Sequence, residues 1–293
     1  MIQDLYVDGT SFASGWGQGL ERNLFKTSTG PKSWVDYLAD LVNCNNLWNH
    51  SLVAKPLDMQ FYDIQQFCKQ YFNAFKTFDN LFVVVEFSFI TYRSFDPVKA
   101  VEGQFKNENI YPVVLSKASE LETEKYLIHY VRKSNDYLKP QEPIFSKVNP
   151  EQVDVNDIIK TEQAAKQWLL AQRSNFSKHS SFLEHLNYAY NIISNIKKFF
   201  KDRNIPFLIY SAAVSDNNPQ KEHIDFGLRT LSKDNRMVPL TQFTGQTISK
   251  KHSIEEYVNH PDKQGHIKIA TALYNWIEKH DLTKKPNSSI ITT

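Results

Sequence analysis

Buried-strand patterns that alternate with amphipathic helical patterns constrain the fold of this chain more than any other feature. Residues 81–85, Leu-Phe-Val-Val-Val, form a continuous apolar run, which is typical of a strand buried on both faces of a parallel sheet. The runs at 5–7 and 205–210 have the same character. Apolar residues recur at helical spacing between and after these runs, within 34–41, 61–78, 186–200 and 269–277. The alternation predicts an α/β fold, a three-layer αβα sandwich around a central parallel sheet.

Polar residues at the expected helix starts support this assignment. Ser33 with Asp36, and Ser181 with Glu184, have the spacing of capping boxes, and Asp262 is placed to cap the last helix. In an open parallel sheet, ligands bind beyond the carboxyl ends of the strands. Residues that directly follow the predicted strands are therefore the candidates for a functional site.

A long stretch after the predicted strand at 81–85 interrupts the pattern. Residues from about 94 to 180 are mixed in charge and rich in proline. We interpret this stretch as an insertion carrying short strands and a helix or two, within a single domain of residues 1–282. A separate small domain is the alternative. Residues 283–293, with Pro286 and several Ser and Thr, are predicted to form a flexible tail.

The charge balance and the cysteines exclude several classes of protein. The 34 basic and 32 acidic side chains leave a net charge of +2, which gives no electrostatic case for a nucleic-acid or anionic-membrane partner. Two cysteines, Cys44 and Cys68, cannot form a disulfide framework or a thiolate metal site, and both are expected to be reduced core residues. No signal peptide or membrane-spanning run is recognisable. We therefore expect a cytoplasmic or virion-associated protein.

A glycine-flanked serine follows the first predicted strand. In Gly9-Thr-Ser-Phe-Ala-Ser-Gly15, the hydroxyl of Ser11 can stand clear of the sheet, and its own N–H can face a developing oxyanion. The alternative is that Ser11 only caps a helix that begins near Phe12. The glycines at 15, 17 and 19 lack the spacing of a dinucleotide-binding loop, and we expect no cofactor and no metal.

A histidine enters the last predicted helix, in the segment His260-Pro-Asp-Lys-Gln-Gly-His266. The positive end of the helix dipole disfavours an imidazolium there, so His260 stays available as a base at neutral pH. The alternative is an ordinary surface histidine. His266, one turn into the helix, is expected to have a structural role.

Together these two segments resemble the SGNH (GDSL-like) hydrolase superfamily, which has a serine block after strand one and an H-P-[ND]-x-x-G-H block before the last helix. The stretch Glu86–Arg93 is similar to SGNH-like proteins encoded by bacteriophages. The resemblance implies an SGNH/flavodoxin-like fold and acyl transfer to water, in which Ser11 attacks an ester carbonyl and His260 takes its proton. The family's substrates include acetylated sugars, lipid esters and thioesters.

The chain departs from the family pattern at three places. The family's aspartate before the base histidine is missing, and Glu256 is the nearest carboxylate. The oxyanion-hole glycine that the family has after strand two is absent from residues 49–54, and the second donor is expected among the backbone N–H groups of Ser51–Ala54, with Ala54 as a candidate, or the hydroxyls of Ser88 and Thr91. Ser88 stands where the family has asparagine. Arg93, after the strand at 81–85, which corresponds to strand three of the family pattern, is expected to border the pocket, with a solvated surface arginine as the alternative.

Three functional interpretations follow. The first is a serine esterase or carbohydrate O-deacetylase whose substrate is a small ester or an acetylated glycan. The second is a weakly active or inactive binding or structural module of a phage particle, with other virion proteins as partners. The third is an unrelated flavodoxin-like binding protein in which Ser11 is a helix cap.

Overall fold

A four-stranded parallel sheet forms the centre of the molecule in a computed structural model of the chain. Its strands are β1 (Asp4–Asp8), β2 (Asn46–Asn49), β3 (Leu81–Ser88) and β7 (Phe207–Ala213), in the spatial order β2-β1-β3-β7. The structure describes residues 2–10, 12–13, 32–51, 55, 57–88, 93–95, 110–117, 126–132, 137–138, 182–213, 228–249, 252 and 260–286.

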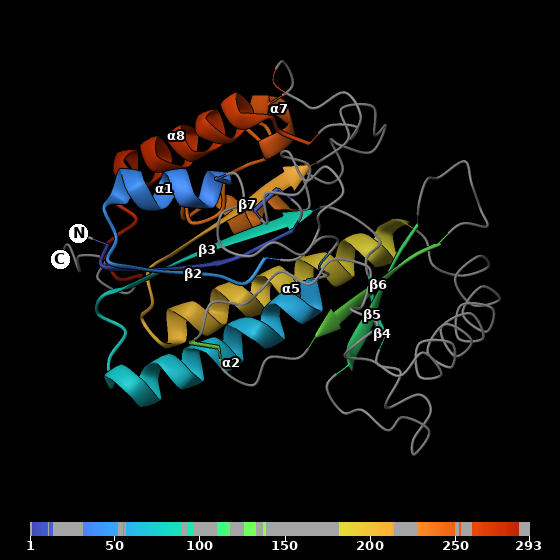
Figure 1. Cartoon of the computed structure of the whole chain (residues 1–293), viewed down its shortest axis with the longest axis horizontal. Coiled ribbons are helices and arrows are strands. Elements are labelled where there is room, and N and C mark those ends of the chain that lie inside the picture. The colour runs from blue at the N-terminus through green and yellow to red at the C-terminus, as the bar shows by residue number, and fades with distance from the viewer. Residues whose placement is uncertain are drawn as a thin grey trace.

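Helices cover both faces of this sheet (Figure 1). One face carries α1 and α8, and the other carries α2 and α5. The helices are α1 (Trp34–Val42), α2 (Leu57–Phe75), α5 (Phe182–Asp202), α7 (Gly245–Ser249) and α8 (Lys263–Lys279). The three-layer α/β architecture predicted from the sequence is therefore confirmed.

Alternating strand residues supply two separate hydrophobic cores. Tyr6, Val83 and Val85 pack against α2 and α5, whereas Leu5, Val7 and Val84 pack against α1 and α8. All of these side chains are fully buried. Successive residues of a strand point to opposite faces, so a strand buried on both sides needs the continuous apolar runs that the sequence shows.

Local helix signals fix several boundaries. Ser33 and Asp36 form the predicted capping box of α1, and the Asp262 carboxylate accepts a hydrogen bond from the N–H of Gly265 at the start of α8. The predicted cap at Ser181 lies outside the described residues. Phe75, expected on the buried face of its helix, is 48% exposed because it lies in the last turn of α2, where it packs on Tyr71.

The insertion after β3 contains strands, as predicted. β4 (Arg93–Phe95), β5 (Ile110–Lys117) and β6 (Tyr126–Arg132) form an antiparallel sheet in the order β4-β5-β6. Further on, the indole N–H of Trp48 donates to the carbonyl of Leu138. The insertion is thereby tied to β2 of the central sheet.

The two cysteines and the end of the chain complete the fold. Cys68 is buried in the core, but Cys44 is only partly buried, and both are free thiols. At the start of the predicted tail, the carbonyl of Lys284 accepts a hydrogen bond from Arg236. None of the described helices is both long and apolar enough to cross a bilayer.

Candidate active site

The structure describes one of the two candidate catalytic residues directly. His260 is half-buried and lies just before α8, whereas Ser11, Glu256 and Ala54 lie outside the described residues. Ser88 is the last residue of β3 and Arg93 the first of β4; only their backbone is described. The predicted roles of all six residues, His260 included, therefore stay predictions, and the described residues around them define the site.

The turn that carries Ser11 is packed tightly against the sheet. A Cβ atom at Gly9 would lie 2.7 Å from the Cβ of Ala13, and 3.0 Å from both the Cβ of Glu86 and the Oγ of Ser51. A side chain at position 9 would therefore clash, and only glycine allows the turn to lie this close to β3 and to the loop after β2. Thr10 and Ala13 are buried on either side of Ser11.

The side chain of Glu86, in β3, accepts the hydrogen bonds that hold this turn. Its Oε1 accepts hydrogen bonds from the N–H of Thr10 at 2.9 Å, from the hydroxyl of Thr10 at 2.7 Å and from the N–H of Ala13 at 3.2 Å. Its Oε2 accepts from the indole N–H of Trp34 at 2.8 Å and from the hydroxyl of Tyr210 at 2.6 Å. One fully buried carboxylate thus receives five hydrogen bonds.

The protonation of Glu86 follows from these partners. Burial raises its pKa above the ordinary value, and the hydrogen bonds from Tyr210 and Thr10 oppose that shift. Burial, followed by the charge of Glu86, raises the pKa of Tyr210 well above its usual value, so the tyrosine remains a donor. Because all five groups around the carboxylate are donors, they match its acceptor-only, ionised form.

Packing explains two residues of the histidine block, Gly265 and His266. A Cβ atom at Gly265 would lie 2.6 Å from the carbonyl oxygen of His252 and 2.9 Å from the Cβ of Pro261, so the position requires glycine. The buried Nδ1 of His266 accepts a hydrogen bond from the N–H of Trp34 at 3.0 Å, which places the ring proton on Nε2. Burial, and then the neighbouring His260, lower the pKa of His266 to about 3.

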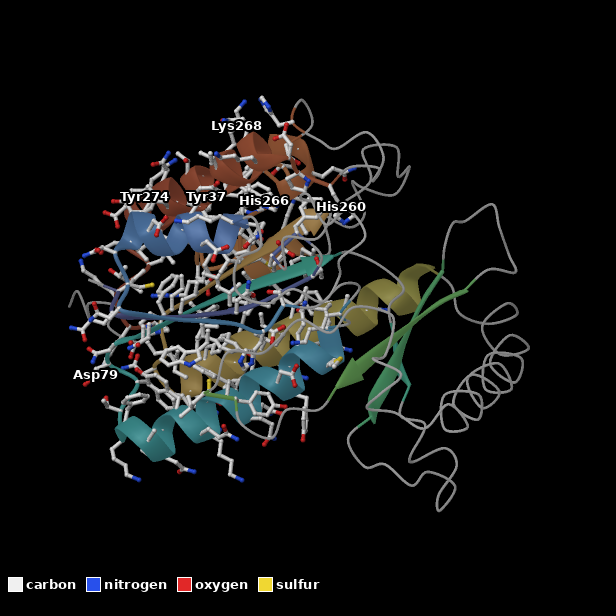
Figure 2. All side chains as sticks on the ribbon, viewed as in Figure 1. Tyr37, Asp79, His260, His266, Lys268 and Tyr274 are labelled. Carbon is white, nitrogen blue, oxygen red and sulfur yellow. The ribbon has the colours of Figure 1, made fainter. Side chains whose placement is uncertain are left out.

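The two sequence blocks meet through a ring contact. Phe12, the residue after Ser11, packs against His260 with 5.1 Å between the ring centroids. A Cβ atom at Gly245 would lie 3.0 Å from the Phe12 ring and 2.9 Å from the carbonyl oxygen of Ala212, so this contact lies at the end of β7. Figure 2 shows His260 beside the end of β7, with His266 further back towards α1. The serine turn and the histidine block therefore lie at the carboxyl ends of the strands.

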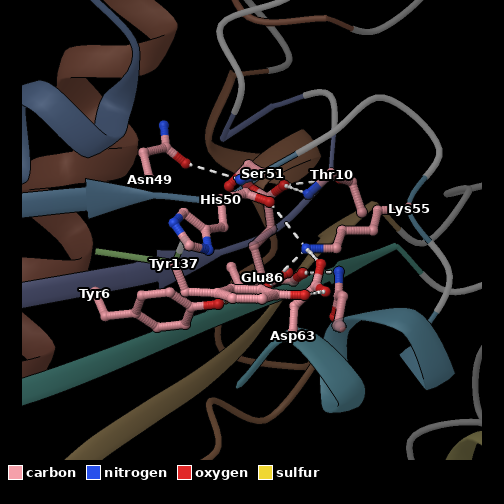
Figure 3. Close-up of polar contacts among 11 residues, drawn as sticks. Tyr6, Thr10, Asn49, His50, Ser51, Lys55, Asp63, Glu86 and Tyr137 are labelled. Carbon is pink, nitrogen blue, oxygen red and sulfur yellow. Dashed lines mark hydrogen bonds and ion pairs between the residues drawn. The ribbon is translucent and has the colours of Figure 1, made fainter. Parts of the chain in front are cut away.

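A second polar cluster lies on the other face of the sheet, around Lys55 (Figure 3). The fully buried Lys55 ammonium lies 2.8 Å from an oxygen of Asp8 and 2.6 Å from an oxygen of Asp63, and it donates to the carbonyl of His50 at 2.9 Å. Tyr6 donates to Asp8, and Tyr137 donates to Asp63. The cluster joins the end of β1, the loop after β2, α2 and the insertion.

The titration behaviour of this second cluster reflects its burial. Desolvation lowers the Lys55 pKa, but the charges of Asp63 and Asp8 outweigh it, so the net shift is upward and the ammonium stays charged. Burial raises the pKa of Asp8, and the Lys55 charge opposes that shift. Burial and then the Lys55 charge lower the pKa of His50 to about 3. His50 is therefore neutral near pH 7.

Sequence reasoning missed both polar clusters. The available signal was a charged residue within or next to a buried strand: Glu86 follows the apolar run 81–85, and Asp8 ends the run 5–7. Such residues are almost never fully buried unless they are paired. Within the part of the chain that the structure describes, no group of three or more His, Cys, Asp or Glu side chains could hold a metal ion.

Comparison with known proteins gives one distant structural similarity. No protein-family model matches the chain, and no curated protein matches it in sequence. The fold is similar to the crystal structure of a candidate GDSL-like lipase from Parabacteroides merdae, with a TM-score of 0.39 and 13% sequence identity over 96% of each chain.

Proposed function

We propose that this chain is an SGNH-type serine hydrolase that cleaves ester bonds, with Ser11 as nucleophile and His260 as general base. The observation that carries the proposal is the contact between Phe12 and His260, since it brings the serine turn next to the histidine block. In an α/β sheet this meeting point, beyond the carboxyl ends of the strands, is where substrates bind.

The chemistry is a two-step acyl transfer. His260 accepts the Ser11 proton while Oγ attacks the ester carbonyl, and the protonated imidazole then returns the proton to the departing alcohol. Water, activated by the same histidine, hydrolyses the acyl-serine and releases the acid. We expect Ser11 Oγ within roughly 2.6–3.5 Å of a ring nitrogen of His260.

The charge on the tetrahedral oxygen needs two converging donors. We assign one to the N–H of Ser11 and the other to a backbone N–H within 51–54, such as that of Ala54, or to the hydroxyl of Ser88 or Thr91. We assign orientation of His260 to Glu256, and contact with the substrate to Arg93. A hydroxyl reaches less far than the family's asparagine amide, so we expect small acyl groups, as in an O-acetylated glycan, to react best.

Turnover of p-nitrophenyl acetate tests this proposal. Wild type should exceed the buffer rate, whereas Ser11→Ala and His260→Ala should fall to it. Thr271→Ala and His280→Asn are the matched controls, because Thr271 is exposed on α8 and His280 caps the far end of that helix. Equal rates for wild type and Ser11→Ala would contradict the proposal, and glycan binding without turnover would identify a recognition module instead.

A further inference from the structure

We infer that Glu86 is a positioning residue that fixes the Ser11 turn relative to the histidine block. The inference rests on the proposed function for its catalytic consequence, but the structural part can be tested separately. Glu86 is fully buried inside β3, one of the two central strands of the sheet. Its backbone pairs with Tyr210 of β7, and its carbonyl accepts a hydrogen bond from the side chain of Gln60, so the carboxylate projects from a fixed position.

The bonds on the turn side bracket the nucleophile. Oε1 of Glu86 accepts hydrogen bonds from the N–H and the hydroxyl of Thr10, and a third from the N–H of Ala13. These residues stand on both sides of Ser11 in the chain. A shift of the carboxylate would therefore displace the whole turn, including the Ser11 N–H that we assign to the oxyanion hole.

The bonds on the other side lead to the histidine block. Oε2 of Glu86 accepts from the Trp34 indole, while the backbone N–H of Trp34 donates to Nδ1 of His266. His266 and His260 belong to one short segment at the start of α8. Trp34 thus links the carboxylate that holds the serine turn to the segment that holds the base.

The chemistry of this link favours a carboxylate of this length. Glutamine at position 86 would keep an acceptor for the turn but would direct an amide N–H₂ group towards the Trp34 N–H, and two donors cannot bond. Aspartate would keep the charge but would withdraw it by one methylene. A misplacement of about 1 Å at a reacting centre can lower turnover roughly 100-fold.

Four variants and two readouts test the inference. Glu86→Asp, Glu86→Gln and the milder Thr10→Val each disturb bonds to the turn. Tyr71→Phe is the matched control, because Tyr71 donates the same kind of buried bond to Asp4 at the opposite end of β1. The readouts are amide hydrogen exchange at Thr10 and Ala13, and kcat and KM for p-nitrophenyl acetate.

We expect faster exchange at both amides in Glu86→Asp and Glu86→Gln, and at the amide of Thr10 in Thr10→Val. We also expect kcat to fall about 100-fold in Glu86→Asp with KM changed less than twofold. Tyr71→Phe should leave both readouts unchanged. If Glu86→Gln does not fold, the Thr10→Val and Glu86→Asp variants decide whether Glu86 positions the turn.

Two results would overturn the inference: unchanged exchange at Thr10 and Ala13 in the Glu86 variants, or an unchanged kcat in an active enzyme. A wild type without turnover, and without labelling of Ser11 by a fluorophosphonate, would remove the proposed function instead. In that case the exchange data still decide whether Glu86 holds the turn.

Discussion

The two faces of the sheet bury charge in different ways at the same end of the strands. On the face covered by α1 and α8, Glu86 is surrounded by N–H and O–H donors. On the face covered by α2 and α5, Lys55 lies between two carboxylates, Asp8 and Asp63. The first cluster is built from hydrogen bonds to one carboxylate, whereas the second centres on two ion pairs, to which Tyr6, Tyr137 and the His50 carbonyl add hydrogen bonds.

This difference indicates different tasks. Hydrogen bonds depend on angle as well as distance, so the Glu86 cluster fixes the geometry of the turn it holds. Coulomb attraction has little angular dependence, and a buried ion pair contributes little net stability over apolar groups of the same shape. Once such a pair exists, however, removing one partner leaves a buried charge without compensation. The fold therefore needs the Lys55 ammonium mainly to compensate the buried carboxylates of Asp8 and Asp63.

Substitution of Lys55 should have the largest effect on stability. Lys55→Met leaves two buried carboxylates without their cation, and we expect the free energy of unfolding to fall by about 3–5 kcal/mol. Urea denaturation monitored by circular dichroism measures it. The control is Lys198→Met, which breaks an exposed pair with Asp202 and should cost less than about 1 kcal/mol. Similar losses for the two variants would show that the Lys55 cluster is not an ionic anchor.

Trp34→Phe, with a smaller expected loss, compares the stability that an indole N–H gains from a charged acceptor with what it gains from a neutral one. Trp34 donates to the Glu86 carboxylate, and we expect the loss of this bond to cost about 1.5–3 kcal/mol. Trp48→Phe is the matched control, since the Trp48 indole donates to the neutral carbonyl of Leu138 and should cost about 0.5–1.5 kcal/mol. The comparison would fail if Trp48→Phe proved the more costly change in thermal or urea unfolding.

The elements of the fold could be predicted from sequence because their signals are local. The apolar run at 81–85, the Ser33 cap and the Asp262 cap each lie within a few residues, and the structure has them in place. The polar clusters could not be predicted in this way. Glu86 and Thr10 come together only when β3 pairs with β1. The sequence around each residue carries no signal that the two are hydrogen-bonded.

The histidines of the two clusters should make stability sensitive to acid. His266 and His50 each have a folded-state pKa of about 3, below the ordinary value, so the unfolded chain binds more protons. Their contribution is complete above about pH 6.5 and is lost as the pH falls towards 3. The raised pKa values of Glu86 and Asp8 act in the opposite direction.

Substitution of His266 alone isolates its contribution to the pH dependence of the unfolding free energy. Between pH 7 and pH 5, wild type should lose roughly 2 kcal/mol more stability than His266→Asn, whose amide oxygen can still accept the Trp34 N–H. Urea titrations at the two pH values measure the difference. Parallel losses in the two proteins would mean that His266 is not held neutral by the fold.

The smallest effect is expected for Tyr137→Phe in the Lys55 cluster. Tyr137 donates to Asp63, which keeps its ion pair with Lys55 when the hydroxyl is removed. We therefore expect a loss at the low end of the range for a hydrogen bond to a charged group, about 1.5 kcal/mol in unfolding free energy. A loss as large as that of Lys55→Met would indicate that the insertion, rather than the ion pair, organises this face.

The most direct test of the account is covalent labelling of the proposed nucleophile. The intact mass of wild type after incubation with a fluorophosphonate should increase by one phosphonyl group, and peptide mapping should place it on Ser11. Ser11→Ala should gain no mass, and Glu86→Asp should label more slowly because its turn is displaced. An unlabelled wild type, or a label on another residue while Ser11 stays unmodified, would contradict the claim that this turn presents a reactive serine.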